Sequence, residues 1–129
     1  MAGYSGTPLS TKLGIKDHSV VQVVGELLPV GLPVHPTPAA TAPFDVLLVF
    51  LTQAQQLRSG IERWGADIAR NGGLWICWPK KTARTVIASD MTEDIIREVV
   101  LPLGLVDNKV CAVDELWSGL RVVWRKELR

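Results

Sequence analysis

The sequence is poor in the residues that build metal and redox sites. Its 129 residues include only two cysteines and two histidines, and no Cys-x-x-Cys pair occurs. A zinc site needs several such ligands at close spacing. Cys77 and Cys111 each lie in an apolar run, where a free thiol behaves as a small buried hydrophobe. We therefore expect two structural thiols and no bound metal.

Long apolar runs are also missing. The longest, residues 46–51, is far shorter than the roughly 20 residues of a membrane helix, and the first residues lack a signal-peptide core. The net charge is +1, from 14 basic and 13 acidic side chains, which gives no broad positive field for a polyanion such as DNA. The sequence predicts a cytoplasmic protein that binds neither membranes nor nucleic acids.

No glycine-rich phosphate loop follows the first predicted strand, residues 20–24. Residues 25–31 read GELLPVG, which is neither G-x-G-x-x-G nor a Walker sequence. Neither His18 nor His35 lies in a motif typical of a hydrolase triad. The sequence therefore assigns no catalytic residue and no cofactor.

What the sequence does contain is enough apolar material for one domain. It is 47% hydrophobic and 21% charged, a balance typical of globular proteins, and its length suits a single core. Five of the eight prolines fall between residues 25 and 43, where we expect only a helical turn and a short strand near Val34. We treat residues 1–129 as one domain.

A strand, a helix and a second strand follow the proline-rich segment. Residues 46–51 form an unbroken apolar run, which predicts a buried strand over residues 45–51 at the centre of the sheet. Thr52 and Gln55 predict the capping box of a helix that ends at residues 71–73. Residues 74–79 then form the next strand, and so short a return predicts a right-handed crossover between parallel strands.

The second half of the chain predicts one helix and two further strands. Asp90 and Glu93 form a second capping-box candidate. The helix after them has an apolar face made of Met91, Ile95, Val99 and Leu103. Residues 109–113 and 120–124 predict an antiparallel pair whose last strand is at or near the edge. The expected fold is α/β, a Rossmann-like three-layer sandwich with a mostly parallel sheet that ends in an antiparallel hairpin.

The tetrapeptide Trp78-Pro79-Lys80-Lys81 lies where a central parallel strand ends. Open α/β sheets bind ligands beyond the carboxyl ends of their strands. The two ammonium groups, with Arg84 nearby, could hold a phosphate or a carboxylate. The alternative is a solvated charged loop.

Residues 114–119 connect the last two strands and place a tryptophan in a turn. Trp117 is either the wall of a site for a flat ligand or a lid folded back over the core. With the lysine tetrapeptide, this loop completes the predicted ligand-binding set of Trp78, Lys80, Lys81, Arg84, Lys109, Asp114, Trp117 and Ser118.

Several motifs resemble a family of small bacterial proteins of unknown function. They are GYSGTPL at residues 3–9, WPKK at 78–81, TEDxxRE at 92–98 and GLVDNKVCAVDExWSGL at 104–120. The resemblance runs nearly end to end, is weakest across residues 29–43, and implies no particular activity.

The order of elements also resembles a shortened class I methyltransferase, whose Rossmann-like sheet ends in an antiparallel hairpin. This resemblance is at the level of the fold. Methyltransferases of this class have a glycine-rich turn after the first strand and an acidic residue at the end of the second, which hold S-adenosylmethionine. Residues 25–27 and 34–36, GEL and VHP, supply neither.

The leading hypothesis is a non-catalytic binding or regulatory domain with a small anionic ligand at Trp78, Lys80 and Lys81. One alternative is a degenerate methyltransferase-like transferase for an anionic substrate, with Lys80, Asp90, Glu93 and Asp114 as its polar candidates.

A third hypothesis is an interaction module that forms a homodimer through its C-terminal hairpin. Trp117, Trp124 and the last strand would make the isologous contact.

Overall fold

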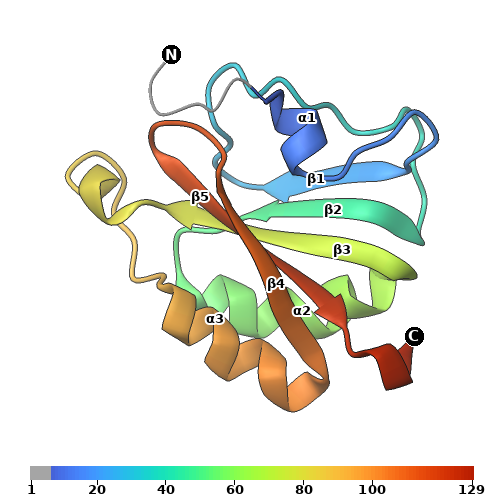
Figure 1. Ribbon diagram of the computed structural model, residues 1–129. Helices are drawn as coiled ribbons and strands as arrows, with labels where there is room; N and C mark the ends of the chain where they lie inside the picture. Colours follow the sequence, from blue (N-terminus) through green and yellow to red (C-terminus); the bar gives the residue numbers. More distant parts are fainter. Residues whose placement is uncertain (1–6) are drawn as a thin grey trace.

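The computed structural model describes residues 7–129, which form a five-stranded sheet with helices (Figure 1). The strands are β1 (Val21–Gly25), β2 (Phe44–Phe50), β3 (Ile68–Pro79), β4 (Leu105–Ala112) and β5 (Trp117–Trp124). Their order is β1-β2-β3-β5-β4. β1, β2 and β3 pair in parallel, and β5 runs antiparallel to both β3 and β4. Within this sheet β5 is the one strand that runs opposite to the other four. The predicted α/β class is confirmed.

The two faces of the sheet are covered differently. Helices α2 (Ala54–Asp67) and α3 (Glu93–Val100) lie together on one face, and α1 (Leu9–Lys12) lies apart from them near β1 (Figure 1). The opposite face is covered by Leu13, just after α1, and by Val34 of the proline-rich segment. Short 3-10 turns complete the described part of the chain: η1 (Lys81–Ala83), η2 (Leu101–Leu103) and η3 (Lys126–Leu128). The second face therefore has a thin cover of one short helix and loop instead of a layer of long helices.

β2 is buried on both of its faces, which explains why its apolar residues do not alternate with polar ones. Leu47 and Val49 face the helices, whereas Leu48 and Phe50 face the opposite core, and all four are buried. A strand buried on both faces needs an unbroken apolar run. β2 is interior as predicted, although β3 takes the middle position of the sheet.

The proline-rich segment differs from its prediction. Residues 26–43 contain no strand, so the short strand expected near Val34 is not formed. Val34 is buried instead in the core opposite the long helices. With five prolines, the segment crosses the core as irregular chain because proline cannot donate to a ladder.

The junction of α2 and β3 also differs from its prediction. The helix ends at Asp67 and the strand begins at Ile68, not after residues 71–73. Phe44 pairs with Ile68 and Val46 pairs with Gly73, so the intervening residues of β3 bulge out of the ladder. A Cβ on Gly72 would lie 2.8 Å from the Phe44 carbonyl oxygen. The glycines therefore serve a bulge of the strand and do not end the helix.

Both predicted helix caps are shifted along the chain. The N-cap of α2 is Gln53, whose capping-box partner is Gln56. The N-cap of α3 is Thr92, whose hydroxyl accepts a hydrogen bond from the Ile95 N–H at 3.1 Å. Because α3 starts later than expected, its buried face differs from the predicted one.

The buried face of α3 consists of Ile96 and Val100. Ile95 and Val99 are only half-buried, and Leu103 is 37% exposed. Met91 is fully buried but precedes the helix. The predicted apolar face is therefore one residue out of phase.

Asp90 was predicted to cap the helix that follows it, α3, but it caps α2 instead. Its Oδ1 accepts a hydrogen bond from the Ala54 N–H at 2.7 Å, at the start of α2. The Asp90 N–H in turn donates to the Thr52 carbonyl at 3.3 Å. These contacts join the segment before α3 to the start of α2.

The last strand, β5, lies one place in from the edge, between β3 and β4. This agrees with a near-edge position, and it leaves β4 as the edge strand on that side. No helix within residues 7–129 is long and apolar enough to cross a membrane.

Replacing Asp90 with alanine tests the cap on α2. Loss of the carboxylate leaves the Ala54 N–H without its acceptor, so we expect Asp90→Ala to lower the free energy of unfolding by about 1 kcal/mol. Urea denaturation followed by circular dichroism measures this. The control is Asp94→Ala, which removes an exposed carboxylate 3.6 Å from Arg97. Equal losses in the two variants would contradict the assignment.

Candidate functional site

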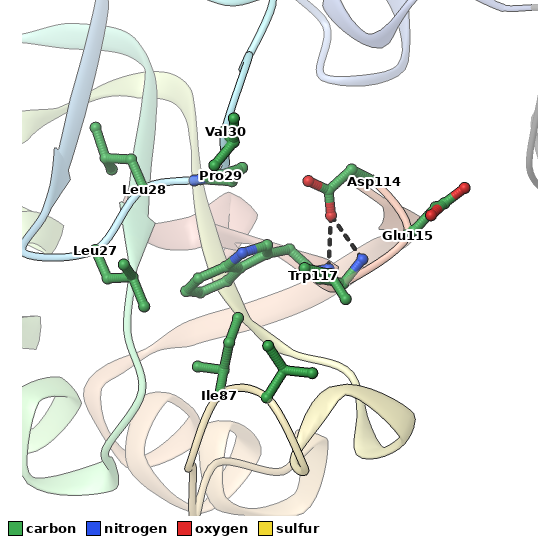
Figure 2. Close-up of a pocket in the computed structure, with 10 residues that line it drawn as sticks. Leu27, Leu28, Pro29, Val30, Ile87, Asp114, Glu115 and Trp117 are labelled. Carbon is green, nitrogen blue, oxygen red and sulfur yellow. Dashed lines mark hydrogen bonds between the residues drawn. The ribbon is translucent and has the colours of Figure 1, made fainter.

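A pocket of about 520 Å³ opens at the edge of the sheet where the parallel strands end (Figure 2). Its walls come from residues 27–30 after β1, residues 86–87 after β3 and the 114–117 loop between β4 and β5. This is the edge at which open α/β sheets bind ligands.

The pocket gathers apolar side chains that water can reach. Within residues 7–129, nine large apolar side chains are exposed, and five of them line this one pocket. The five are Leu27, Leu28, Val30, Val86 and Leu116. A contiguous exposed apolar surface with a polar rim is typical of a binding site.

Trp117 forms the inner wall of the pocket and belongs to the core. Its side chain is only 1% exposed. The indole meets the Phe50 ring edge to face, with centroids 5.4 Å apart and planes at 83°. Figure 2 shows the indole extending between Leu27 and Ile87. The sequence left Trp117 either as the wall of a site for a flat ligand or as a lid over the core, and the structure shows it folded onto the core.

Asp114 holds the rim in shape. Its Oδ1 accepts hydrogen bonds from the backbone N–H groups of Leu116 and Trp117, both at 2.8 Å (Figure 2). An aspartate that bonds its own backbone two residues on stabilises a tight turn. The Lys80 N–H donates to the Leu116 carbonyl at 2.8 Å and ties the turn to the end of β3. With the exposed Glu115, the described lining carries two carboxylates and no cation.

The structure places two of the eight predicted site residues, Asp114 and Trp117, at this pocket. Trp78 is 7% exposed and packs in the core under α2 and α3. Ser118 is half-buried beside it, because the two residues are register partners across β3 and β5.

The predicted cations are dispersed. Lys80 is half-buried and Lys81 exposed, and neither lines the pocket. Arg84 Nη2 donates to the Met91 carbonyl at 2.7 Å, while its buried Nε has no partner within the described residues. Lys109 lies on β4 and lines a different cavity, at the other end of the strands. The geometry therefore does not assemble the predicted anion site from these residues.

The polar residues of the transferase alternative are also held apart in structural contacts. Asp90 caps α2, and Glu93 pairs with Arg97 at 3.0 Å on α3. Arg97 also contacts Asp107 of β4 at 3.2 Å, and the hydrogen bond to Asp107 raises the pKa of this guanidinium. These contacts fasten α3 to β4 and leave only Asp114 at the pocket.

The two cysteines lie on either side of Gly119. Cys77 of β3 and Cys111 of β4 are both register partners of this glycine on β5, and both thiols are free. Burial raises the pKa of Cys77 and of Cys111, so both remain protonated near neutral pH and are poor nucleophiles. Within residues 7–129 no group of three or more His, Cys, Asp or Glu side chains is placed to hold a metal ion.

Sequence reasoning missed the apolar walls of the pocket. Leu27, Leu28 and Val30 lie among prolines, and Val86 lies in a polar connection. The available signal was the presence of large apolar residues in segments that cannot form helix or strand.

Comparison with solved structures supports the fold. Magnesium protoporphyrin IX methyltransferase (ChlM) from Synechocystis PCC 6803 with bound SAH is 15% identical, with a TM-score of 0.52 over 65% of this chain and 46% of that chain. The same enzyme with bound SAM is 14% identical, with a TM-score of 0.50 over 65% of this chain and 40% of that chain. This chain has a methyltransferase-like α/β fold. It spans less than half the length of these enzymes.

The other comparisons give no family. No protein-family model matches the chain, and no curated protein matches it. At 15% identity or less, the two methyltransferase structures establish the fold and nothing about activity. The resemblance to the small bacterial family stays a prediction.

The turn after β1 is closely packed at Gly25. A Cβ on Gly25 would lie 3.0 Å from the Cβ and the carbonyl oxygen of Phe50, and 3.1 Å from Leu28 Cδ2. The space that this glycine leaves is filled by protein atoms. Gly25 thus allows the ends of β1 and β2 to pack closely.

Removing the Asp114 carboxylate tests what shapes the rim. Asp114→Ala leaves two turn N–H groups without their acceptor, so we expect the free energy of unfolding to fall by about 1–3 kcal/mol. Glu115→Ala, next to it, removes an exposed carboxylate and should change stability by less than about 0.5 kcal/mol. Chemical denaturation of both variants measures the difference. Equal stability of the two would show that the turn does not depend on Asp114.

Proposed function

We propose that this chain is a non-catalytic binding domain whose pocket takes a small apolar ligand carrying a cationic group. The observation that carries the proposal is the concentration of Leu27, Leu28, Val30, Val86 and Leu116 at the carboxyl edge of the sheet.

Size and apolar lining both favour a small molecule. Ligand pockets commonly measure about 300–1,000 Å³ and are lined mainly by apolar side chains with a few placed polar groups. The pocket of about 520 Å³ falls within this range. Each Å² of apolar surface that a ligand covers contributes roughly 25 cal/mol, so the exposed leucine and valine side chains supply the main attraction.

The charge of the rim selects the sign of the ligand. Asp114 uses Oδ1 for the turn, and its Oδ2 accepts no hydrogen bond within the described residues. Glu115 is exposed beside it. Two carboxylates next to an apolar surface favour a cation, through charge-assisted hydrogen bonds. The anionic ligand predicted from Lys80 and Lys81 is therefore not assigned to this pocket.

Two dyes of opposite charge test this pocket. We expect thioflavin T, a cationic aromatic dye, to bind more tightly than the anionic dye 8-anilinonaphthalene-1-sulfonate in fluorescence titrations. Val30→Lys, at a fully exposed pocket residue, should weaken thioflavin T binding about tenfold, because it adds a like charge and removes apolar area.

The matched control is Val110→Lys, which makes the same change at a 61% exposed valine of β4 outside the pocket. Glu115→Gln should weaken binding by about two- to fivefold, with Glu127→Gln as its control. Equal effects of the two lysine variants, or tighter binding of the anionic dye, would contradict the proposal.

A methyltransferase-like transferase is the second candidate, favoured by the likeness to structures that hold SAM or SAH. If the chain is a non-catalytic binding domain, we expect neither compound to change the melting temperature. A bound compound at about 100 times its dissociation constant would add roughly 2.7 kcal/mol, or several degrees for a domain of this size. A thermal-shift titration with each compound decides, and a saturable rise of several degrees would favour the second candidate.

The homodimer and the cytoplasmic location stay predictions. β5 is enclosed by β3 and β4, so the edge strand of the hairpin that a second copy could pair with is β4.

A further inference from the structure

A second cavity, of about 380 Å³, lies at the opposite end of the strands from the apolar pocket. It is bounded by Lys12–Gly14 at the end of α1, by the start of β2 and by Asn71 in the bulge of β3. Four cationic side chains are among its described lining residues: Lys12, Lys16, Lys109 and Arg121. They come from both ends of the sequence and meet only in the fold.

Positive charge is concentrated at this cavity. The described lining has a single acidic residue, Asp45, against four cations, whereas the whole chain has a net charge of only +1. Asp45 Oδ2 already accepts a hydrogen bond from the Val20 N–H at 2.7 Å. No ion pair within residues 7–129 joins Asp45 to Lys16, Lys109 or Arg121. The acid therefore organises the start of β1 and does not pair with these three cations.

Arg121 lines the cavity and is held there by packing against β3. Arg121 is half-buried, and its guanidinium makes no hydrogen bond or ion pair within the described residues. It lies against the backbone of Gly73, since a Cβ there would overlap Nε and would lie 2.8 Å from Cζ. Only glycine at this position leaves the guanidinium its place.

Burial of Arg121 has an energetic consequence. Burial, with a smaller contribution from Arg129, lowers the pKa of the Arg121 guanidinium. A cation that is partly removed from water without a counter-ion is unfavourable, and an anion beside it relieves that cost.

Leu13, which lines the cavity, is held in place by a hydrogen bond from the core. Trp75 lies beside Arg121 across the β3–β5 ladder, and its Nε1 donates to the Leu13 carbonyl at 3.0 Å. Leu13 is itself 1% exposed and lines the cavity. The hydrogen bond from Trp75 therefore anchors the segment that carries Lys12 and Lys16 to the sheet.

We propose that this cavity binds the phosphate group of a small phosphorylated molecule. Guanidinium donors match phosphate oxygens in pairs, and lysines add charge without fixed geometry. The volume suits a phosphate with a small organic part. The site is separate from the apolar pocket and does not rest on the function proposed for it.

The test is a titration of the ¹⁵N-labelled protein with inorganic phosphate, pyrophosphate and glucose 6-phosphate, followed by the amide shifts of Gly14, Asn71 and Gly73. We expect saturable shifts at these amides. Gly73→Ala should weaken binding about tenfold, because the new Cβ displaces the guanidinium and every charge is kept. The melting temperature should not fall, because only the end of a flexible side chain has to move.

Further variants keep the test decisive. Arg121→Met should lower affinity about tenfold, and the exposed pair Lys16→Gln and Lys109→Gln by about threefold each without affecting folding. Lys126→Gln, an exposed lysine outside the cavity, is the control and should change nothing.

Three outcomes would overturn the proposal. The first is that the amide signals show no saturable shift with up to 10 mM of any of the three compounds. The second is that Gly73→Ala and the unaltered protein bind these compounds with equal affinity. The third is that citrate binds more tightly than all three compounds. Tighter binding of glucose 6-phosphate than of inorganic phosphate would support a phosphorylated metabolite, and the reverse would support free phosphate as the ligand of the same site.

Discussion

The insertion of β5 between β3 and β4 is the constraint on which both cavities depend. β5 pairs with β3 from Leu74 to Pro79 and with β4 along nearly its whole length. At its first residue, which pairs with Pro79 of β3, the strand brings Trp117 to the apolar pocket. Farther along, the same strand brings Arg121 to Gly73 at the basic cavity. One strand thus sets the geometry of the sheet at both of its ends.

The parts of the fold that were predictable are those specified by local pattern. The apolar run of β2, the helix after it and the return into β3 follow from residues that are neighbours in the sequence. The caps were not predictable in the same way. Asp90 is near α3 in sequence but bonds the Ala54 N–H of α2, and no local pattern reports a contact made through the fold. Similarly, residues 71–73 look like a helix stop, yet they form a bulge, and Gly73 makes room for an arginine from a distant strand.

The candidate site was predictable only at the level of the sheet edge. The rule that ligands bind at strand ends indicated the edge at which Asp114 and Trp117 line the candidate pocket. It could not decide which face each side chain takes. Trp78 points to the helix side of β3, whereas Trp117 points to the opposite core, and a change of one residue in register would reverse either. Nor could it show that the lining is apolar, because Leu28 and Val86 come from segments with no periodicity.

The placement of the two cysteines around Gly119 determines whether they can form a disulfide with each other. Both residues pair with the same glycine from opposite sides, so their backbones are two strand spacings apart, roughly 10 Å. A disulfide requires Cα atoms within about 7 Å. Without breaking the β5 ladders, Cys77 and Cys111 cannot cross-link, and the folded domain forms no disulfide between them in a reducing or an oxidising compartment. The fold is therefore held without a covalent link between its strands.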